Sequence, residues 1–164
     1  MALYRIKQFY WGITSKIDLK DKRFLNQHLS EKELMLFNKL NKHEKKHCIK
    51  TAMDAEVVCL KNNVNNKILI KAALLHDIGK IDYNTNLIQK SFMVVLNKLF
   101  KDKMRKYEGY KVVDVFYNHP ENGYKILKNY DYDERFLYLI KNHHNNDIIG
   151  DKELDILKQC DNKN

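Results

Sequence analysis

The chain reads KILIKAALLHDIGK from Lys67 to Lys80. Apolar residues occupy nearly every face of the helix that this stretch predicts, and such a helix is typically buried in a core. Its last turn carries His76 and Asp77 side by side, followed by Gly79 as a stop signal. A carboxylate in an apolar interior is costly unless it is paired, hydrogen-bonded or bound to a metal. Fold and function therefore both depend on what His76 and Asp77 bind.

Two interpretations of this pair follow from the stretch alone. His76 and Asp77 form either a buried hydrogen bond that caps a helix end or part of a metal site. Five further residues favour the metal site, because each lies within or at the end of an apolar helical segment. They are His47, His119, His143, His144 and Asp161. Such a set exceeds what one tetrahedral Zn requires, and it predicts two metals bridged by one carboxylate.

Length and composition indicate one all-α domain. The chain has 164 residues, with only five glycines and one proline, and periodic segments rich in Lys, Leu, Glu and Ile. No internal repeat or low-complexity linker marks a boundary, so we expect a single domain over residues 1–164. Within it, residues 1–29 are predicted to be an N-terminal helix and a charged segment, and residues 30–161 to form the core.

A net charge of +9 and a pI of about 9.3 permit two interpretations. A polyanionic partner is one of them. The other is composition alone, because an abundance of Lys, Asn, Ile and Tyr is what an AT-rich coding sequence produces. The lysines are spread along the chain without an Arg-rich or aromatic-interleaved block, so no nucleic-acid partner is indicated. We still expect the positive charge to create an electropositive field that attracts a small anionic substrate.

The cysteines and the hydropathy pattern favour a cytoplasmic location. Cys48, Cys59 and Cys160 show no CxxC spacing, which predicts reduced thiols rather than disulfides or a zinc site. No signal peptide is evident at the N-terminus. The longest apolar run, 92–96, is far shorter than the roughly 20 residues that span a bilayer.

Apolar periodicity and capping signals predict the helices of the N-terminal half. Residues 3–13 are predicted to form a short amphipathic helix, which we expect to dock on the core rather than to lie on a membrane surface, and residues 14–29 are predicted to be charged and irregular. Ser30 and Glu33 form a capping box that opens the next helix, which residues 41–44 interrupt. A further helix, residues 45–60, carries His47 on or beside its apolar stripe.

The C-terminal half is predicted to contain a long amphipathic helix over residues 87–106, with a basic end that we interpret as solvated rather than as a membrane or partner surface. Its apolar face comprises Ile88, Phe92, Val95, Leu96, Leu99, Phe100 and Met104. Pro120 suits the first position of a new helix, which would place His119 at a helix start. Asp131 and Asp133 open a helix that ends at His143–His144, and residues 151–160 form the last helix.

The order H…HD…H…HH…D, with HDIGK around Asp77 and HPENGYKIL from His119, resembles the HD-domain superfamily of metal-dependent phosphohydrolases. The resemblance covers about Ser30 to Asp161 and is closest to the HDIG group, which includes the HD-GYP cyclic di-GMP phosphodiesterases. It implies a bundle of five or more helices around a binuclear, sometimes trinuclear, centre. By this resemblance one metal is held by His47, His76, Asp77 and Asp161. The second is held by Asp77 as the bridge with His119 and His143, and His144 assists the second metal or a third.

The chain also departs from the two groups of HD proteins that it most resembles. The HD-GYP group carries Glu after its paired histidines and then a GYP loop, whereas Asn145, Asn146 and Asp147 follow here and no GYP occurs. A Glu that serves a third metal in some of that group is replaced by His43. A six-ligand group that hydrolyses diadenosine tetraphosphate usually has Thr after its fourth histidine, where this chain has His144.

The implied activity is hydrolysis of a phosphomonoester, phosphodiester or phosphoanhydride of a nucleotide-like substrate by metal-activated water. Asp77 would bridge the metals and orient the nucleophile, and Lys80 would bind the phosphate or stabilise the leaving oxygen, unless it is merely a solvated lysine at a helix end. Fe or Mn is favoured, with Zn, Ni, Co or Mg permitted. A mixed-valent di-iron oxygenase and a non-catalytic signalling module are the alternatives, and a homo-oligomer is left open.

Overall fold

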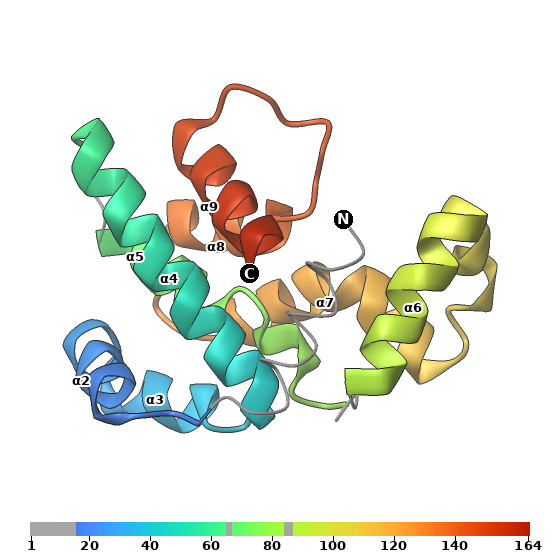
Figure 1. Ribbon diagram of the computed structural model, residues 1–164, viewed down its shortest axis with the longest axis horizontal. Coiled ribbons are helices and arrows are strands. Elements are labelled where there is room, and N and C mark those ends of the chain that lie inside the picture. Colours follow the sequence, from blue (N-terminus) through green and yellow to red (C-terminus); the bar gives the residue numbers. More distant parts are fainter. Residues whose placement is uncertain (1–15, 65–66, 84–86) are drawn as a thin grey trace.

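The structure is a computed structural model that describes residues 16–64, 67–83 and 87–164. Within these ranges the chain is helical and contains no strand, which confirms the predicted all-α fold (Figure 1). The predicted helix at residues 3–13 lies outside the described residues. The α-helices are α2 (Leu19–His28), α3 (Glu31–Phe37), α4 (Lys42–Asn62), α5 (Lys67–Leu75), α6 (Leu87–Phe100), α7 (Lys111–Leu127), α8 (Glu134–Asn142) and α9 (Lys152–Lys163). Two 3-10 segments complete them, η1 (Ile78–Lys80) and η2 (Lys101–Tyr107).

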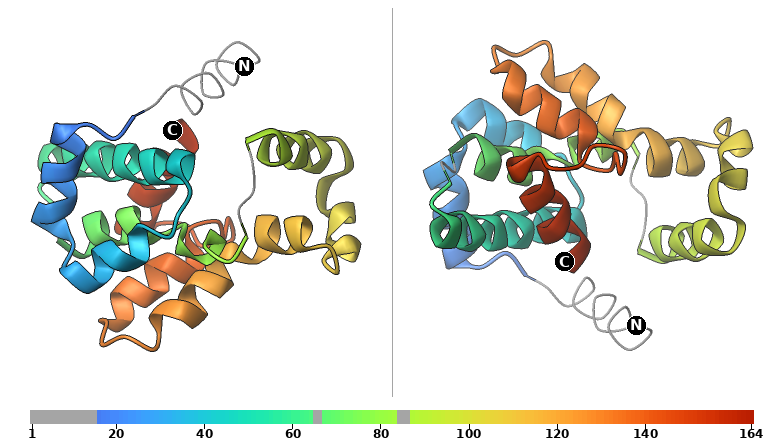
Figure 2. Two further views of the ribbon diagram at one scale, coloured as in Figure 1. Left: turned by 90° about the horizontal axis from the view of Figure 1, so that it is seen from below. Right: turned by 90° about the horizontal axis from the view of Figure 1, so that it is seen from above.

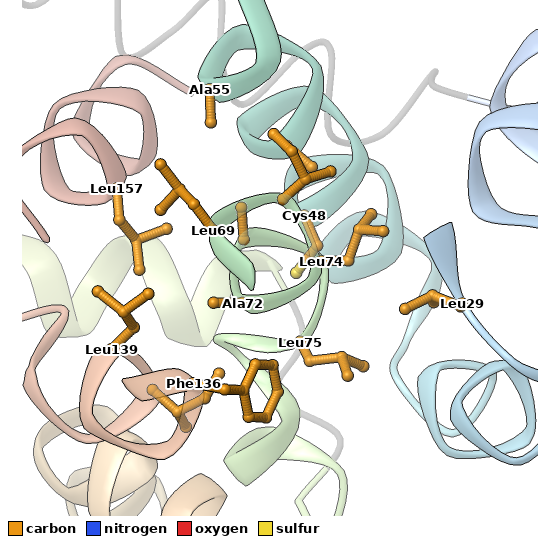
Figure 3. Packing of buried hydrophobic residues seen from close by; sticks show 14 of the residues in the cluster. Leu29, Cys48, Ala55, Leu69, Ala72, Leu74, Leu75, Phe136, Leu139 and Leu157 are labelled. Carbon is orange, nitrogen blue, oxygen red and sulfur yellow. The ribbon is translucent and has the colours of Figure 1, made fainter. Parts of the chain in front are cut away.

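Helix α5 lies in the middle of the bundle, with α4, α8 and α9 packed around it. Figure 3 shows its side chains between residues of α4 on one side and residues of α8 and α9 on the other. Leu69, Leu74 and Leu75 are fully buried, as the apolar sequence of this helix predicts. Each buried leucine contributes about 1.5–3 kcal/mol relative to an exposed one, so α5 anchors the fold.

The α5 helix ends earlier than expected. It stops at Leu75, so His76 and Asp77 lie in a turn between α5 and η1 rather than in the last helical turn. Gly79 does not act as a left-handed stop signal. A Cβ atom there would overlap the carbonyl oxygen of His119 and lie 2.6 Å from the amide nitrogen of Gly123, both in α7. Glycine is required at this position because η1 and α7 approach each other closely.

The prediction of an irregular segment over residues 14–29 was wrong, because α2 forms within it. Asp18 caps this helix in a reciprocal capping box, accepting from the Asp21 amide at 2.9 Å while Asp21 accepts from the Asp18 amide at 2.9 Å. Phe24 and Leu25 are buried against the core. The many charges in this segment concealed a short apolar stripe that tertiary packing exploits.

The capping box at Ser30 is confirmed. The Ser30 amide donates to Glu33 at 2.7 Å, and the Glu33 amide donates to the Ser30 hydroxyl at 3.4 Å. The two helices are interrupted as expected, but earlier than the predicted residues 41–44: α3 ends at Phe37, and Asn41 caps α4 by accepting from the Glu44 amide at 3.1 Å. Helix α4 thus begins three residues before the predicted start.

The prediction that Pro120 opens a new helix was wrong. Helix α7 runs without a break from Lys111 to Leu127, and Pro120 lies inside it. His119 is therefore in the middle of a helix rather than at a helix start. The helix tolerates the proline at a cost in backbone hydrogen bonding, and the side chain that compensates for it belongs to the candidate site described below.

The long helix predicted over residues 87–106 is divided: α6 ends at Phe100, and the 3-10 segment η2 begins at Lys101. Its predicted apolar face is not the buried one: Phe92 and Leu99 are 61% and 69% exposed, whereas Met93 is 3% exposed. Figures 1 and 2 show α6 in an arm beside α7, away from the other helices. In the part of the chain that the structure describes, no helix combines the length and hydropathy needed to cross a bilayer.

Helices α8 and α9 are tied together by Arg135. Its guanidinium donates to Asp151 at 2.7 Å through Nη1 and to Glu153 at 2.6 Å through Nε. Asp133 caps α8 and Asp151 caps α9, so the ion pairs join one helix start to the next. This connection holds the register of α9, which carries Asp161 near its C-terminal end.

The close approach of η1 to α7 leads to a first prediction. We expect Gly79→Ala to lower the free energy of unfolding by about 3 kcal/mol, because the new methyl group meets backbone atoms that cannot rotate away. Chemical denaturation followed by circular dichroism measures this change. Gly109→Ala is the matched control, because a Cβ atom at Gly109 meets nothing within 4 Å. Equal stability of the two variants would contradict the packing argument.

Candidate metal centre

Five separate segments bring the predicted ligands to one place in the bundle. Each ligand lies at the inner face or the end of a helix that packs on α5 or η1. The contributors are His47 from α4, His76 and Asp77 from the turn after α5, His119 from α7, His143 and His144 from the end of α8, and Asp161 from α9. Every predicted site residue thus converges on the same region.

The Asp77 carboxylate lies at the centre of this cluster and its side chain is only 1% exposed. Its Oδ2 is 3.6 Å from Nε2 of His76 and 3.8 Å from Nε2 of His47. Its Oδ1 faces the other way, 3.4 Å from Nε2 of His119 and 2.6 Å from the ammonium of Lys80. The two oxygens of this one carboxylate therefore lie near two different sets of imidazoles.

These sets form two groups of potential ligands. In the first, Asp161 Oδ1 lies 2.8 Å from Nε2 of His47 and 3.4 Å from Nε2 of His76. The second comprises His119, His143 and His144. Within each group, one ligand atom per residue lies within 4.8 Å of the others, a separation that one metal ion can bridge.

Three of the imidazoles are oriented by the backbone of their own helix. In each, Nδ1 faces a carbonyl oxygen three or four residues earlier. The acceptors are the carbonyls of Ala73, Val115 and Ile140, at 2.9, 3.0 and 2.7 Å from Nδ1 of His76, His119 and His143. A carbonyl only accepts, so Nδ1 carries the proton and the Nε2 of a neutral ring presents its lone pair to the site.

The ring nitrogens and carboxylate oxygens that meet in this cluster require positive charge, which a proton or a metal ion can supply. Nε2 of His143 is 3.3 Å from Nε2 of His119, so two acceptor atoms face each other in a buried site. Nε2 of His76 and both oxygens of Asp77 are also buried without a hydrogen bond of good geometry, although Lys80 pairs with Asp77. Imidazole and carboxylate donors arranged in this way fit divalent metal ions.

The electrostatics agree with this fit. Burial, together with the nearby Lys80 ammonium, lowers the pKa of His119 well below its ordinary value. Burial and the neighbouring His144 do the same to the pKa of His143. Both rings are therefore neutral and available as ligands at pH 7. Burial alone would raise the pKa of the Asp77 carboxyl, but Lys80 and the surrounding imidazoles hold that pKa well below its usual range.

His76 behaves differently from its neighbours. Burial opposes a charge on its ring, yet the carboxylate of Asp77 raises the pKa of His76 well above its ordinary value. In the metal-free protein a proton on His76 thus supplies part of the positive charge that Asp77 requires. Metal binding at this position would displace that proton.

Pro120 explains the orientation of His119. Proline has no amide hydrogen, so the carbonyl of Phe116, four residues earlier, loses its helical donor. Nδ1 of His119 lies 3.2 Å from that oxygen, in addition to its contact with Val115, and supplies the missing donor. The same contact therefore compensates for the missing backbone hydrogen bond and orients the imidazole of His119.

Exposure varies across the cluster and identifies its open side. The side chains of His76 and Asp77 are buried, whereas that of Asp161 is 10% exposed and that of His144 is 48% exposed. Nδ1 of His144 lies 3.7 Å from Oδ2 of Asp161, so this histidine stands at the rim above both ligand groups. A substrate would enter past His144.

Two residues near the cluster were not predicted from the sequence. Glu44 is fully buried, with Oε2 3.7 Å from the Lys80 ammonium. Cys48 is also fully buried, and its sulfur lies within 4.8 Å of ligand atoms of His76 and Asp77. Glu44 lies three residues before His47, a spacing that shares a helix face, and this was its only signal. Cys48 directly follows His47 and points about 100° away from it, so its position gave no such signal.

The comparison with known protein families agrees with this geometry. The chain matches the HD domain family over residues 45–163, well over half of its length, and it belongs to that family. The match begins at Lys45, later than the Ser30 expected from the motifs, and extends just beyond Asp161. No curated protein and no solved structure matches the chain significantly.

The role of Pro120 can be tested directly. We expect Pro120→Ala to leave the fold intact but to weaken metal binding about tenfold, because the new amide satisfies Phe116 and releases His119 from one of its acceptors. Calorimetric titration of the metal-free protein with Mn²⁺ measures the affinity. Unchanged affinity would show that the contact with Val115 alone orients the ring.

The two adjacent histidines should differ in their effect on metal binding. We expect His143→Ala to remove about one metal ion per chain, because it deletes a buried lone pair that faces His119. His144→Ala should retain most of the metal, since His144 is half exposed at the rim. Elemental analysis of both variants makes the comparison. Equal losses would mean that the two rings bind as one unit.

Proposed function

We propose that this protein is a metal-dependent phosphohydrolase that cleaves a phosphate ester or anhydride of a nucleotide-like substrate. Membership of the HD domain family supports the coarse assignment to metal-dependent hydrolases. One observation carries the proposal further. The buried Asp77 carboxylate directs one oxygen toward His47 and His76 and the other toward His119, which suits a carboxylate that bridges two metals.

The proposed ligand set follows the two groups. His47, His76, Asp77 and Asp161 would hold one metal, and Asp77 with His119 and His143 would hold the second. His144 would assist the second site from the rim. Nitrogen-rich sites with carboxylates favour Fe or Mn, while Zn, Ni, Co and Mg also accept these donors.

Bound metal ions would supply a water of lowered pKa and would neutralise charge on the phosphate. The chain supplies the remaining functions. Asp77 orients the reacting groups because its two oxygens are fixed between the imidazoles. Lys80 places its ammonium 2.6 Å from Asp77, where it could donate to a phosphate oxygen or to the leaving oxygen. The buried walls exclude bulk water, and the His144 side admits the substrate.

A phosphorylated substrate suits the charge of the molecule. The net charge of +9 attracts anions, and Lys80 provides a positive group inside the cluster. A nucleotide is the class that the motif resemblance favours. The HD-GYP-like subtype stays a prediction, as does the single domain over residues 1–164.

The proposal is tested by measuring metal content and phosphate release on anaerobically purified protein. We expect close to two metals per chain and release of phosphate or a nucleoside monophosphate from at least one member of a nucleotide panel. Asp77→Asn should lose metal and reduce turnover by more than about a hundredfold, since it removes the shared ligand. Circular dichroism of the variant establishes that the fold survives.

Other outcomes would redirect the assignment. Two iron ions with oxygen consumption and no phosphate release would indicate an oxygenase. A purified protein without metal, in which Asp77→Asn alters stability alone, would indicate a binding module. Full metal content in Asp77→Asn would refute the bridging role of this carboxylate.

A further inference from the structure

A second buried carboxylate, besides that of Asp77, contacts the ammonium of Lys80. Glu44 lies in the first turn of α4, is 0% exposed, and directs Oε2 toward the Lys80 ammonium at 3.7 Å. Its other oxygen, Oε1, lies 3.4 Å from Nε2 of His43. The Lys80 ammonium therefore contacts two carboxylates, that of Glu44 and that of Asp77, whose Oδ1 lies 2.6 Å away.

The contacts of Lys80 with Asp77 and with Glu44 would differ once metal is bound. Asp77 is a candidate metal ligand, so bound cations would draw on the same Oδ1 that now pairs with Lys80. Glu44 belongs to neither ligand group. Its ion pair is the contact of Lys80 that does not compete with the metals. Without it, a lysine beside two divalent cations would be driven toward solvent by charge repulsion.

We propose that Glu44 is a positioning residue that keeps the Lys80 ammonium in the metal-loaded site, where Lys80 acts on the substrate phosphate. The proposal rests on the phosphohydrolase function above and assigns the part of the site that lies outside the family match, which starts at Lys45. The side chain of Lys80 is long and flexible and only 11% exposed, so its ammonium needs a fixed partner to stay inside the site.

A purely structural role for Glu44 is the competing explanation. An acidic residue in the first turn of a helix interacts favourably with the helix dipole, and the Glu44 amide is already capped by Asn41. A structural role predicts lower stability without a specific effect on Lys80. The chain offers a control for this effect in Glu33, another buried first-turn glutamate, which pairs with Lys71 at 2.8 Å and belongs to no ligand group.

The test compares Glu44→Gln with Glu33→Gln, using Mn²⁺-loaded protein and bis(p-nitrophenyl) phosphate and p-nitrophenyl phosphate as probes. We expect Glu44→Gln to keep the metal content of the wild type and to lose about tenfold in kcat, as is typical when the partner of an active-site group is removed. Glu33→Gln should lower stability and leave kcat unchanged. In a Lys80→Met background, Glu44→Gln should cause no further loss, because both changes act through the same ammonium.

A second measurement does not depend on activity. Acetylation of Lys80 by acetic anhydride, followed by peptide mass spectrometry, should be several-fold faster in Mn²⁺-loaded Glu44→Gln than in the wild type or in Glu33→Gln. Unchanged acetylation of Lys80, or an equal loss of kcat in both glutamate variants, would overturn the proposal. If the wild type hydrolyses neither probe nor any nucleotide, the phosphohydrolase function fails, and the acetylation rates still decide whether Glu44 holds Lys80.

Discussion

A negative charge in the core, that of the Asp77 carboxylate, is the constraint on which the arrangement of this protein depends. An isolated carboxylate in an apolar interior would be prohibitively costly, so the surrounding helices must supply positive charge or hydrogen-bond donors. They supply the Lys80 ammonium and a ring of imidazoles, most of which are neutral. These groups compensate the carboxylate only in part, and the remaining deficit is what makes the cluster suited to divalent cations.

The imidazoles of His76, His119 and His143 gain their orientation from local helical geometry rather than from long-range contacts. A histidine whose Nδ1 reaches a carbonyl one turn earlier has its Nε2 directed away from its own helix. His76 and His143 achieve this at helix ends, where carbonyls lack amide donors. His119 achieves it inside α7, because Pro120 leaves a carbonyl without its usual donor. Two different backbone situations thus produce the same ligand geometry at three histidines.

The sequence predicted the buried helix, the all-α class and the histidines and aspartates that the fold brings together, because these depend on apolar periodicity in α5 and on the order of His and Asp along the chain. It misplaced features that depend on tertiary contact. Helix α2 was hidden by its charges, and the open face of α6 was taken as the buried one. Gly79 looked like a helix stop, but its role is set by α7, which lies 40 residues further along the chain. Glu44 could not be recognised because its partner, Lys80, is brought to it only by folding.

The distance along the chain between ligands has a consequence for folding kinetics. His47 and Asp161 are 114 residues apart in sequence and 2.8 Å apart in space, so the pair forms only when α9 docks on α4. Contacts of such long range are assembled late, after the local helical hairpins. A metal that bridges them has little to bind in the transition state, and its affinity is expressed in the unfolding rate rather than the folding rate. Bound metal would therefore slow unfolding and lengthen the lifetime of the folded chain, without speeding folding.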